Sequence, residues 1–406
     1  MRHTASRAAW PVRPLAECGR LLSGGTPSKA RPEFWEGTIP WFSSKEIKSF
    51  DLRDTELHVS EQGAENGSHL VPAGSVLFVV RGMSLANEFR VGITLVDATF
   101  NQDVKAVVPS NDIDSRYLAR CLRWLEPNVL RSTGESSHGT KRLSGQIFEN
   151  LPIPVPPMAE QRRIAEILDK ADAIRRKRTA SIALIDQLLR SAFLEMFGDP
   201  VTNPKGWPVT ALGEHLAIDP RIGTLVPASD NPGTLVVRVG ELGAYDVDLA
   251  FSKRATLSDA EFARFGLETG DVLLARAIGS EDHLGKASVL QAHSEPVAFD
   301  SHVMRLRFRD DALDPYVFVQ WLRSAGGRAR FLNEAGRTAV QFNVNGKQIV
   351  KVKIPLPPRH EQGRFRRLFD SVRVIERRSH EAVRQSDTLF NSLVARAFSG
   401  LLENAC

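Results

Sequence analysis

Two copies of one motif constrain the fold of this chain more than any other feature. Each copy is a proline-rich tract that runs directly into a charged segment, and the copies span residues 153–161 and 354–362. Pro154 and Pro355 lie 201 positions apart, which is about half of the 406 residues. The chain is therefore expected to repeat one structural plan twice.

The segment after each tract predicts a long helix. Prolines at alternating positions exclude helix within the tract and favour an extended backbone. Beyond it, apolar residues recur in steps of three and four over about 40 residues, which indicates an amphipathic helix with a coiled-coil-like seam. The expected seam residues are Ile164, Leu168, Ala171, Ile182, Ile185, Leu189, Ala192 and Met196 in the first helix, and Phe365, Leu368, Val372, Ile375, Ala382, Leu389 and Leu393 in the second.

An apolar seam must be covered, so each helix is expected to pair with the other, and antiparallel packing would hold two recognition modules at a fixed separation. The alternative at this point is an enzyme or scaffold with an ordinary coiled-coil dimerisation arm. Aligning Ala192-Phe193 with Ala397-Phe398 predicts that the second helix is longer by four residues, about one turn.

The remaining sequence indicates mixed α/β regions. Residues 75–80 form an apolar, β-branched run typical of a buried strand, and residues 117–125 have helical spacing. We therefore expect an α+β fold with two mixed α/β domains, each followed by a long helix, and the two helices pairing as an antiparallel coiled coil with pseudo-twofold symmetry. The expected divisions are an N-terminal arm (1–14), a first recognition domain (15–157), a first spacer helix (158–199), a second recognition domain (200–358) and a second spacer helix (359–403).

Composition narrows the class of protein only slightly. The net charge of +5 and pI near 9.2 are compatible with a polyanionic partner, although 48 acidic residues offset 53 basic ones. Three scattered cysteines suggest neither a metal site nor a disulfide framework. The apolar runs are too short to span a bilayer and the first residues lack a signal-peptide core, so a cytoplasmic protein with reduced thiols is expected.

The duplicated tracts resemble those of the specificity subunit of type I restriction–modification systems. The most specific pieces are the two Pro-x-Pro-Pro-x-x-Glu-Gln tracts, and residues 23–28, 39–41 and 101–106 also have the look of that family. The second half has no counterpart of the Gly-Gly-Thr-Pro segment at residues 24–27. That difference suggests two unlike half-sites and hence an asymmetric target.

The resemblance implies a DNA-binding subunit that does no chemistry itself. Its partners would be double-stranded DNA, two modification subunits that bind S-adenosylmethionine and methylate adenine N6, and restriction subunits that use ATP and Mg; this chain would hold no cofactor or metal. The residues agree, because no amino-methylation motif, Gly-x-Gly-x-x-Gly or Walker lysine is present. Glu46-Ile47-Lys48 matches the Glu-x-Lys of many nucleases, but without a partnering Pro-Asp a surface segment is the simpler interpretation.

Polar and basic loops are the candidates for DNA contact, because Arg, Lys, Asn, Gln, Ser and Thr read base edges and bind phosphates. In the first domain the candidates are Thr26, Lys29, Arg31, Arg81, Ser84, Asn87, Ser137, His138 and Lys141. In the second they are Arg276, Ser280, His283, Lys286, Arg337, Gln341, Asn343, Asn345 and Lys347. If extended, residues 341, 343 and 345 would share one face of a strand, from which Gln and Asn side chains could read adenine. An equal alternative is a half-exposed strand whose polar face makes no DNA contact.

Two further groups have structural interpretations. The tract residues are expected to form the junction that turns the chain into each helix, and they are Pro154, Pro156, Pro157, Glu160, Gln161, Pro355, Pro357, Pro358, Glu361 and Gln362. The basic clusters at residues 175–178 and 377–378 are expected to be solvated, with contact to spacer phosphates or a partner subunit as the alternative. A stand-alone methyltransferase or nuclease and a scaffold that never touches nucleic acid remain the competing functions.

Overall fold

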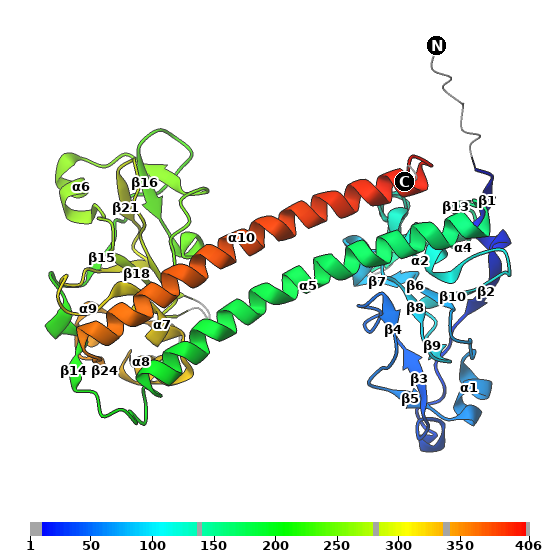
Figure 1. Ribbon diagram of the computed structural model, residues 1–406, viewed down its shortest axis with the longest axis horizontal. Coiled ribbons are helices and arrows are strands. Elements are labelled where there is room, and N and C mark those ends of the chain that lie inside the picture. Colours follow the sequence, from blue (N-terminus) through cyan, green and yellow to red (C-terminus); the bar gives the residue numbers. More distant parts are fainter. Residues whose placement is uncertain (1–9, 136–139, 279–283, 336–341, 403–406) are drawn as a thin grey trace, which may run out of the picture. The chain divides into compact units, whose positions relative to one another are not determined.

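A computed structural model of the protein describes residues 10–135, 140–278, 284–335 and 342–402. The chain divides into unit 1, Met1–Arg178 with Ala382–Cys406, and unit 2, Thr179–Glu381. Each unit contains one α/β domain and part of both long helices, α5 (Met158–Phe197) and α10 (Arg359–Phe398) (Figure 1). The expected fold class is confirmed.

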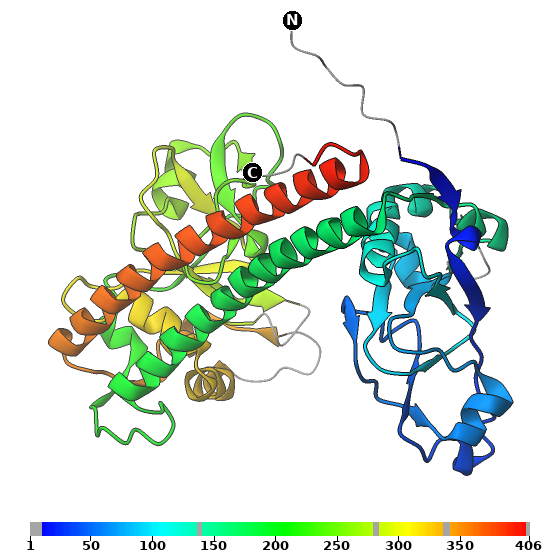
Figure 2. The same cartoon turned by 45° about the vertical axis from the view of Figure 1, so that its right-hand side comes forward.

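Within each unit, α5 and α10 run side by side in opposite directions (Figures 1 and 2). In unit 1 the start of α5 packs against the end of α10, and Arg163 Nη2 donates to the carbonyl of Leu402 at 3.2 Å. In unit 2 the end of α5 packs against the start of α10, and the rings of Phe193 and Phe365 meet edge to face with centroids 5.7 Å apart. The antiparallel pairing expected from the sequence is thus confirmed.

The expected seam is wrong at several positions. Ile375 and Leu389 are 54% and 59% exposed, whereas Phe193, Phe197 and Phe369 are buried. In unit 2 the helices meet through aromatic rings spaced four residues apart, Phe193 and Phe197 on α5 and Phe365 and Phe369 on α10, so the buried face there departs from the three-and-four alternation on which the sequence prediction relied.

The prediction of a longer second helix is also wrong, because α5 and α10 each contain 40 residues. Phe197 and Phe398 are their last residues, and both follow the proline junction at the same distance along the chain. The Ala-Phe pairs compared in the sequence are therefore not equivalent: Ala192-Phe193 lies about one turn before the end of α5.

Unit 1 is built on a five-stranded sheet of order β2-β10-β6-β8-β4, with smaller sheets β5-β3-β9, β11-β12-β7 and β1-β13. Its helices are α1 (Glu61–Gly67), α2 (Ser115–Trp124), α3 (Glu126–Arg131) and α4 (Gly145–Glu149). Its strands are β1 (Val12–Pro14), β2 (Gly19–Ser23), β3 (Ile39–Phe42), β4 (Asp51–Leu52), β5 (His58–Val59), β6 (Val76–Val79), β7 (Arg81–Gly82), β8 (Val91–Thr94), β9 (Thr99–Phe100), β10 (Val104–Pro109), β11 (Gly134–Glu135), β12 (Lys141–Arg142) and β13 (Pro152–Pro154).

The centre of unit 1 is apolar on both faces of the sheet. All four residues of β6 are fully buried, as a strand covered on both sides requires. Helix α2 covers one face; it is capped by Asp114, whose Oδ1 accepts the N–H of Tyr117 at 2.9 Å. Residues 12–14, expected in a loose arm, form β1 instead and pair antiparallel with β13 of the proline tract.

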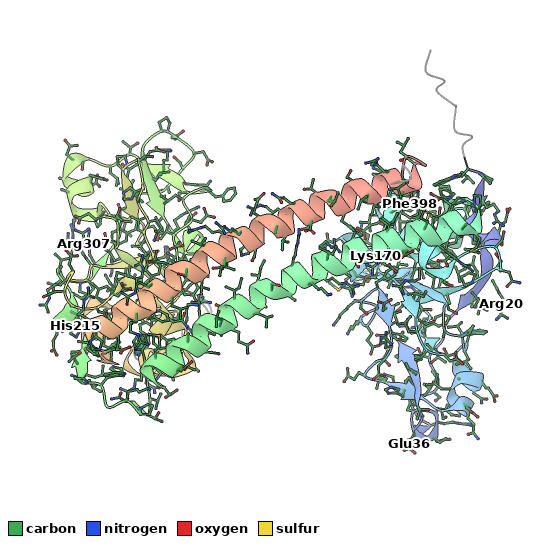
Figure 3. The ribbon with its side chains drawn as sticks, in the orientation of Figure 1. Arg20, Glu36, Lys170, His215, Arg307 and Phe398 are labelled. Atoms are coloured by element: carbon green, nitrogen blue, oxygen red, sulfur yellow. The ribbon has the colours of Figure 1, made fainter. Side chains whose placement is uncertain are left out.

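Residues of α10 complete the core of unit 1. Phe398, at the end of α10 (Figure 3), is 4% exposed. Its ring stacks on Trp124 with centroids 5.1 Å apart. Ala397 and Leu402 are buried in the same core, against which Trp10 is packed. Unit 1 is therefore assembled from two segments that are far apart in the sequence.

Unit 2 repeats this arrangement, with sheets β15-β22-β18-β20, β17-β16-β21, β19-β23 and β14-β24. Its helices are α6 (Asp259–Phe265), α7 (Pro315–Arg323), α8 (Ala325–Ala335) and α9 (Gly346–Ile349). Its strands are β14 (Val209–Ala211), β15 (Arg221–Ile222), β16 (Thr234–Val237), β17 (Lys253–Ala255), β18 (Val272–Ala275), β19 (Ala277–Ile278), β20 (Ala287–Val289), β21 (Val297–Phe299), β22 (Val303–Leu306), β23 (Phe342–Asn343) and β24 (Lys353–Pro355).

Backbone hydrogen bonds show that the Gly-Gly-Thr-Pro segment does have a structural counterpart in unit 2. The N–H of Gly25 donates to Phe100 O, and the N–H of Thr224 donates to Phe299 O, both at 2.9 Å. The preceding residues, Gly24 and Gly223, lie so close to the carbonyls of their neighbouring strands that neither has room for a Cβ atom. The sequence missed this equivalence because only one glycine is shared.

A buried glutamine fixes the start of each long helix. Gln161 Oε1 accepts the N–H of Asp114, and its Nε2 donates to the carbonyls of Asp112 and Pro156, each at 2.9 Å. Gln362 makes the same three contacts, at 2.8–3.2 Å, with Asp314, Ala312 and Pro357. The paired Glu-Gln of the tract therefore ties each helix to the loop that precedes α2 or α7. The neighbouring Glu160 and Glu361 instead form ion pairs with arginines three residues ahead.

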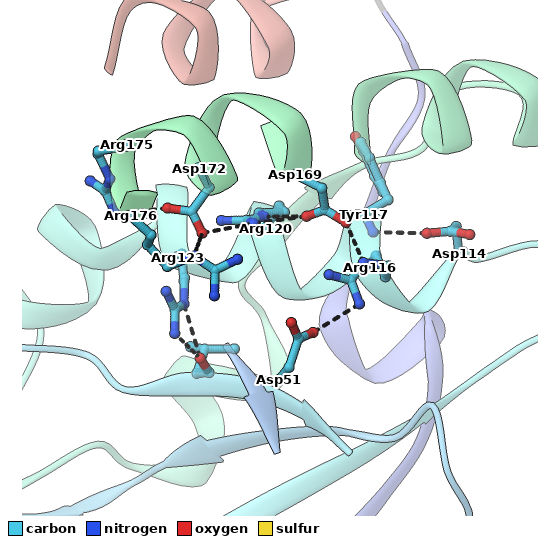
Figure 4. A network of polar contacts seen from close by, with 11 residues as sticks. Asp51, Asp114, Arg116, Tyr117, Arg120, Arg123, Asp169, Asp172, Arg175 and Arg176 are labelled. Carbon is cyan, nitrogen blue, oxygen red and sulfur yellow. Dashed lines mark hydrogen bonds and ion pairs between the residues drawn. The ribbon is translucent and has the colours of Figure 1, made fainter. Parts of the chain in front are cut away.

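Charged side chains hold α2 on α5 in unit 1 (Figure 4). Arg120 is 4% exposed, and its Nη2 lies 2.8 Å from Asp169 Oδ1 and 3.1 Å from Asp172 Oδ2. Arg116 also contacts Asp169 and lies 2.9 Å from Asp51. Burial acts to raise the pKa of Asp172, but Arg120, Arg175 and Arg176 outweigh it, and the pKa of this carboxyl falls below its usual range.

This lowered pKa predicts an acid-labile contribution to the stability of unit 1. An aspartate in the unfolded chain has a pKa of about 3.9. The contribution of Asp172 to stability is fully present above that pH, and it is lost as the pH falls through the lower pKa of Asp172 in the folded protein. We expect the melting temperature of Asp172→Asn to depend less on pH between about 5 and 3 than that of the unaltered protein. Glu166→Gln, which removes an exposed carboxylate from the same helix, is the control; equal slopes for both variants would contradict the role of Asp172.

Candidate nucleic-acid interface

Two of the loops proposed from the sequence lie together in unit 1. Strand β7 pairs with β12, placing Arg81 opposite Arg142 and Gly82 opposite Lys141. Ser84 and Asn87 lie in and just after the 3₁₀ turn that follows β7. The two loops predicted from the sequence, at residues 81–87 and near Lys141, therefore lie on one surface of unit 1.

Lys105 joins this surface, although sequence reasoning did not select it as a contact. Its Nζ lies 2.5 Å from Ser23 Oγ, a hydroxyl and not a carboxylate. Burial lowers the pKa of Lys105, and the nearby cations Arg142 and Arg81 lower it further. Three basic groups are thus held close enough to repel one another, an arrangement that a bound anion would relieve. The feature of the sequence that could have identified Lys105 is a single lysine within the otherwise apolar strand at residues 104–109.

The loop at residues 26–31 reaches the same surface through residues 102 and 103. Thr26 Oγ1 donates to Gln102 Oε1 at 2.8 Å, and the adjacent Asp103 carboxylate lies 3.5 Å from Arg81 Nε. Lys29 and Arg31 are exposed further along the loop, where the Arg31 guanidinium lies 5.3 Å from the centre of the Phe34 ring. We name the surface formed by Ser23, Thr26, Arg81, Gln102, Lys105, Lys141 and Arg142 the unit 1 polar surface.

The corresponding loops of unit 2 also lie together, because β19 pairs with β23 and places Ala277 opposite Asn343. Arg276 is held inward: its Nη1 donates to Ser301 O at 2.9 Å and its Nε to Val344 O at 3.2 Å. Burial lowers the pKa of Arg276. Its observed contacts therefore position the backbone of both loops.

Three other candidates in unit 2 have described side chains. Asn345 Oδ1 accepts the N–H of Gln348 at 3.0 Å and caps α9, so this oxygen already has a structural partner. Lys347 is exposed on α9, and Lys286 is half-buried beside β20. Ser137, His138, Ser280, His283, Arg337 and Gln341 lie outside the described residues. The DNA contacts themselves stay predictions for every candidate.

The Glu-x-Lys match has a structural explanation. Glu46 Oε2 accepts the N–H of Ser43 at 2.9 Å, and its Oε1 accepts the N–H of Glu56 at 3.0 Å. In unit 2, Glu241 accepts the N–H of Arg238 at 2.8 Å in the equivalent turn. The carboxylate of Glu46 therefore shapes a turn that both units share.

The basic cluster at residues 175–178 was expected to be solvated, and residues 176–178 are exposed, but its arginines also make contacts within unit 1. Arg175 lies 2.9 Å from Asp172 and 3.8 Å from Asp387 on α10. Arg178 donates to the carbonyl of Ala382 at 2.9 Å and also contacts Ser386. These arginines therefore join α5 to α10.

Three negative observations apply to the described parts of the chain. None of their helices is long and apolar enough to cross a membrane. None of their His, Cys, Asp and Glu side chains gather in a group of three or more that could hold a metal ion. Cys18 and Cys121 are free and buried, and burial raises the pKa of Cys18 to about 11.

Comparison with solved structures defines the class of fold. A chain from a study entitled "Structural basis underlying complex assembly and conformational transition of the type I R-M system" matches with a TM-score of 0.61 and 17% identity, covering 97% of this chain and 98% of that one. The type I restriction–modification S subunit from M. genitalium matches with a TM-score of 0.56 and 12% identity, covering 98% of both chains. This is the fold of type I specificity subunits.

Sequence comparison finds similarity to the same group of proteins. Residues 8–184 match the type I restriction modification DNA specificity domain. The EcoR124I/EcoR124II specificity subunit of Escherichia coli is 36% identical over 162 residues, 39% of this chain and 40% of that protein's length. The EcoKI specificity subunit of E. coli K12 is 27% identical over 419 aligned positions, covering 97% of this chain and 89% of that protein. The chain is therefore similar to type I restriction–modification specificity subunits, over residues 8–184 by the family's domain and over nearly its whole length by the EcoKI subunit.

Proposed function

We propose that this chain reads a bipartite, asymmetric DNA target, with each unit contacting one half-site. The observation that carries the proposal is that one backbone framework occurs twice with different residues at equivalent positions. The pairings of β7 with β12 and of β19 with β23 make these positions comparable. A common framework with unlike reading surfaces is what recognition of two different half-sites requires.

The differences concern both charge and shape. Positions that are basic or polar in unit 1 carry apolar or neutral residues in unit 2: Arg81 corresponds to Ala277, Arg142 to Asn343, Thr26 to Leu225, and half-buried Lys105 to Met304, which is buried in the core. Leu225 is 85% exposed, and an exposed aliphatic side chain in a reading loop suits contact with a thymine methyl group. The two half-sites are therefore expected to differ in sequence.

The chain would act through other subunits and perform no chemistry itself. Its partners would be double-stranded DNA, two modification subunits that bind S-adenosylmethionine and methylate adenine N6, and restriction subunits that use ATP and Mg, all working in the cytoplasm. The structural use of Glu46 and the missing catalytic motifs support this division of labour.

The test is to express the chain with modification subunits in a host without adenine methylation and to sequence the methylome. We expect a bipartite, asymmetric motif that disappears when this chain is omitted. A symmetric motif would reject the two unlike half-sites, and no chain-dependent motif would reject the function. Methylation or cleavage by the purified chain alone would establish an enzyme instead.

The unit 1 polar surface predicts a phosphate contact at Lys105. In the assembled complex, Lys105→Ala should weaken DNA binding and reduce the slope of log affinity against log salt by about 0.9, as expected for one lost phosphate contact. Arg142→Ala should have a similar effect. The control is Lys170→Ala, which removes an exposed lysine on α5 that pairs with Glu166. If the slope of log affinity against log salt is the same for Lys105→Ala as for Lys170→Ala, Lys105 does not contact a phosphate. If DNA binding by the complex does not depend on salt, the scaffold function is favoured instead.

A further inference from the structure

The contacts between α/β domain and long helix are made differently in the two units. In unit 1, as described above, buried Arg120 of α2 contacts the carboxylates of Asp169 and Asp172 on α5 (Figure 4). In unit 2, Arg373 Nη2 of α10 lies 2.6 Å from Asp246 Oδ2, a carboxylate of the α/β domain. At this contact the cation comes from the domain in unit 1 and from the helix in unit 2, although elsewhere in unit 2 Arg323 of α7 lies 2.8 Å from Asp186 of α5.

The two sets of residues occupy equivalent positions. Asp172 and Arg373 are each the fifteenth residue of a 40-residue helix, and Arg175 and Glu376 are each the eighteenth. Asp172 pairs with Arg175, and Arg373 pairs with Glu376, so the sign of the ion pair is reversed along the helix. In the α/β domains, Asp51 pairs in parallel with Ile93, and Asp246 pairs in parallel with Val289. Ile93 in turn lies opposite the first residue of β6, and Val289 lies opposite the first residue of β18, so the two aspartates are equivalent.

The neighbours of Asp246 fix its position. Tyr316 donates its hydroxyl hydrogen to Asp246 Oδ1 at 2.7 Å, and the ring of Tyr245 lies beneath the Arg373 guanidinium, 5.4 Å from it. The side chains of Arg373, Glu376 and Asp246 are 17%, 17% and 26% exposed. A like charge placed against Asp246 would thus be only partly screened by water.

We propose that these reversed charges make the second recognition domain specific for its own helix, and so fix which domain occupies which end of the helix pair. On α5, Asp246 would meet Asp172 in place of Arg373, and two carboxylates would face each other. On α10, Arg120 would lose one of its two carboxylates and meet Arg373. The binding partner of this surface is a segment of the same chain, and the inference does not depend on the DNA contacts proposed above.

The helix junction cannot provide this selectivity. Gln161 and Gln362 make the same three hydrogen bonds, and both use the N–H of an aspartate, Asp114 or Asp314. The two ends of each domain are also joined in the same way. The backbone N–H of Leu15 donates to Leu151 O at 3.0 Å, and that of Leu212 donates to Val352 O at 2.9 Å, so the domain boundaries are interchangeable. The ion pairs are therefore among the contacts that distinguish a correct domain from an incorrect one, together with the packing of Tyr245 and Tyr316 on Phe369, where α5 has Leu168.

The test uses a full-length chimera in which residues 212–352 also replace residues 15–151, so that both units carry the second domain. The double substitution Asp172→Arg with Arg175→Glu gives α5 the charges of α10. We expect this pair to raise the melting temperature of the chimera by about 5–10 °C and to lower that of the unaltered chain by a similar amount. Equal effects of the same sign in the two proteins would overturn the proposal.

A second measurement applies if the chimera does not fold. In the unaltered chain, Arg373→Asp and Asp246→Lys should each lower the melting temperature, and the two together should restore part of the loss because the pair is re-formed with reversed sign. Arg367→Asp, an exposed position on the same helix, is the control for a charge change alone. A double variant that melts no higher than the less stable single variant would show that the pair does not select the domain.

Discussion

Replacing Gln161 with leucine is expected to lower the free energy of unfolding of unit 1 by about 3 kcal/mol or more. Leucine has nearly the same size but cannot bond, so the N–H of Asp114 and the carbonyls of Asp112 and Pro156 lose their side-chain partner. Gln161 is fully buried, and water cannot replace it without opening the junction between the proline tract and α5. Thermal unfolding followed by calorimetry would measure the effect.

Gln187→Leu is the matched control, because Gln187 is exposed on the same helix. It should change the stability by no more than about 0.5 kcal/mol. Gln362→Leu should reproduce the large effect in unit 2, where the same three contacts occur. If Gln161→Leu melts like Gln187→Leu, the glutamine does not hold the helix start.

Gly24→Ala is expected to destabilise unit 1 by about 3 kcal/mol, at the upper end for overpacking. An added Cβ would lie 2.3 Å from the carbonyl oxygens of both Phe100 and Asn101, and these belong to the backbone and cannot rotate away. Since Thr26 follows two residues later, the displaced segment should also disturb the unit 1 polar surface. The expected outcome is a lower melting temperature together with weaker DNA binding by the assembled complex.

Gly134→Ala provides the comparison, because a Cβ at Gly134 would meet no atom within 4 Å. Gly223→Ala should be as damaging in unit 2, where the added Cβ would lie 2.1 Å from Phe299 O, and Gly240→Ala, again with open space, should be tolerated. Comparable stability of Gly24→Ala and Gly134→Ala would refute the requirement for a close backbone approach at this position.

The repeated plan, the extended tracts and the antiparallel helices were predictable because each leaves a local signature. Alternating prolines restrict the backbone directly, and apolar periodicity reports the buried face of a helix. The signature failed at Ile375 and Leu389, which have the expected spacing but are exposed. Which of the apolar residues on a helix are buried depends on the side chains of the helix that packs against it. The sequence of one helix does not contain that information.

The candidate interface was predictable only in part. Loops rich in basic and polar residues were found, but Lys105 and Gln102 were not assigned to them, because their proximity to Arg81 depends on strand pairing across distant segments. The equivalence of Gly24 and Gly223 was missed for the same reason, since it is defined by hydrogen bonds to β9 and β21. The charge network around Arg120 combines four segments and has no local signal.

The entry of Phe398 and Leu402 into the core of unit 1 has a consequence for synthesis on the ribosome. Unit 2 is continuous in the sequence, from Thr179 to Glu381, and all its residues have been made before those of α10 that finish unit 1. The first α/β domain to be translated must therefore wait, with part of its apolar interior uncovered, until residues 382–402 emerge. We therefore expect unit 1 to complete its fold after unit 2, with apolar surface left open to aggregation while the second domain is made.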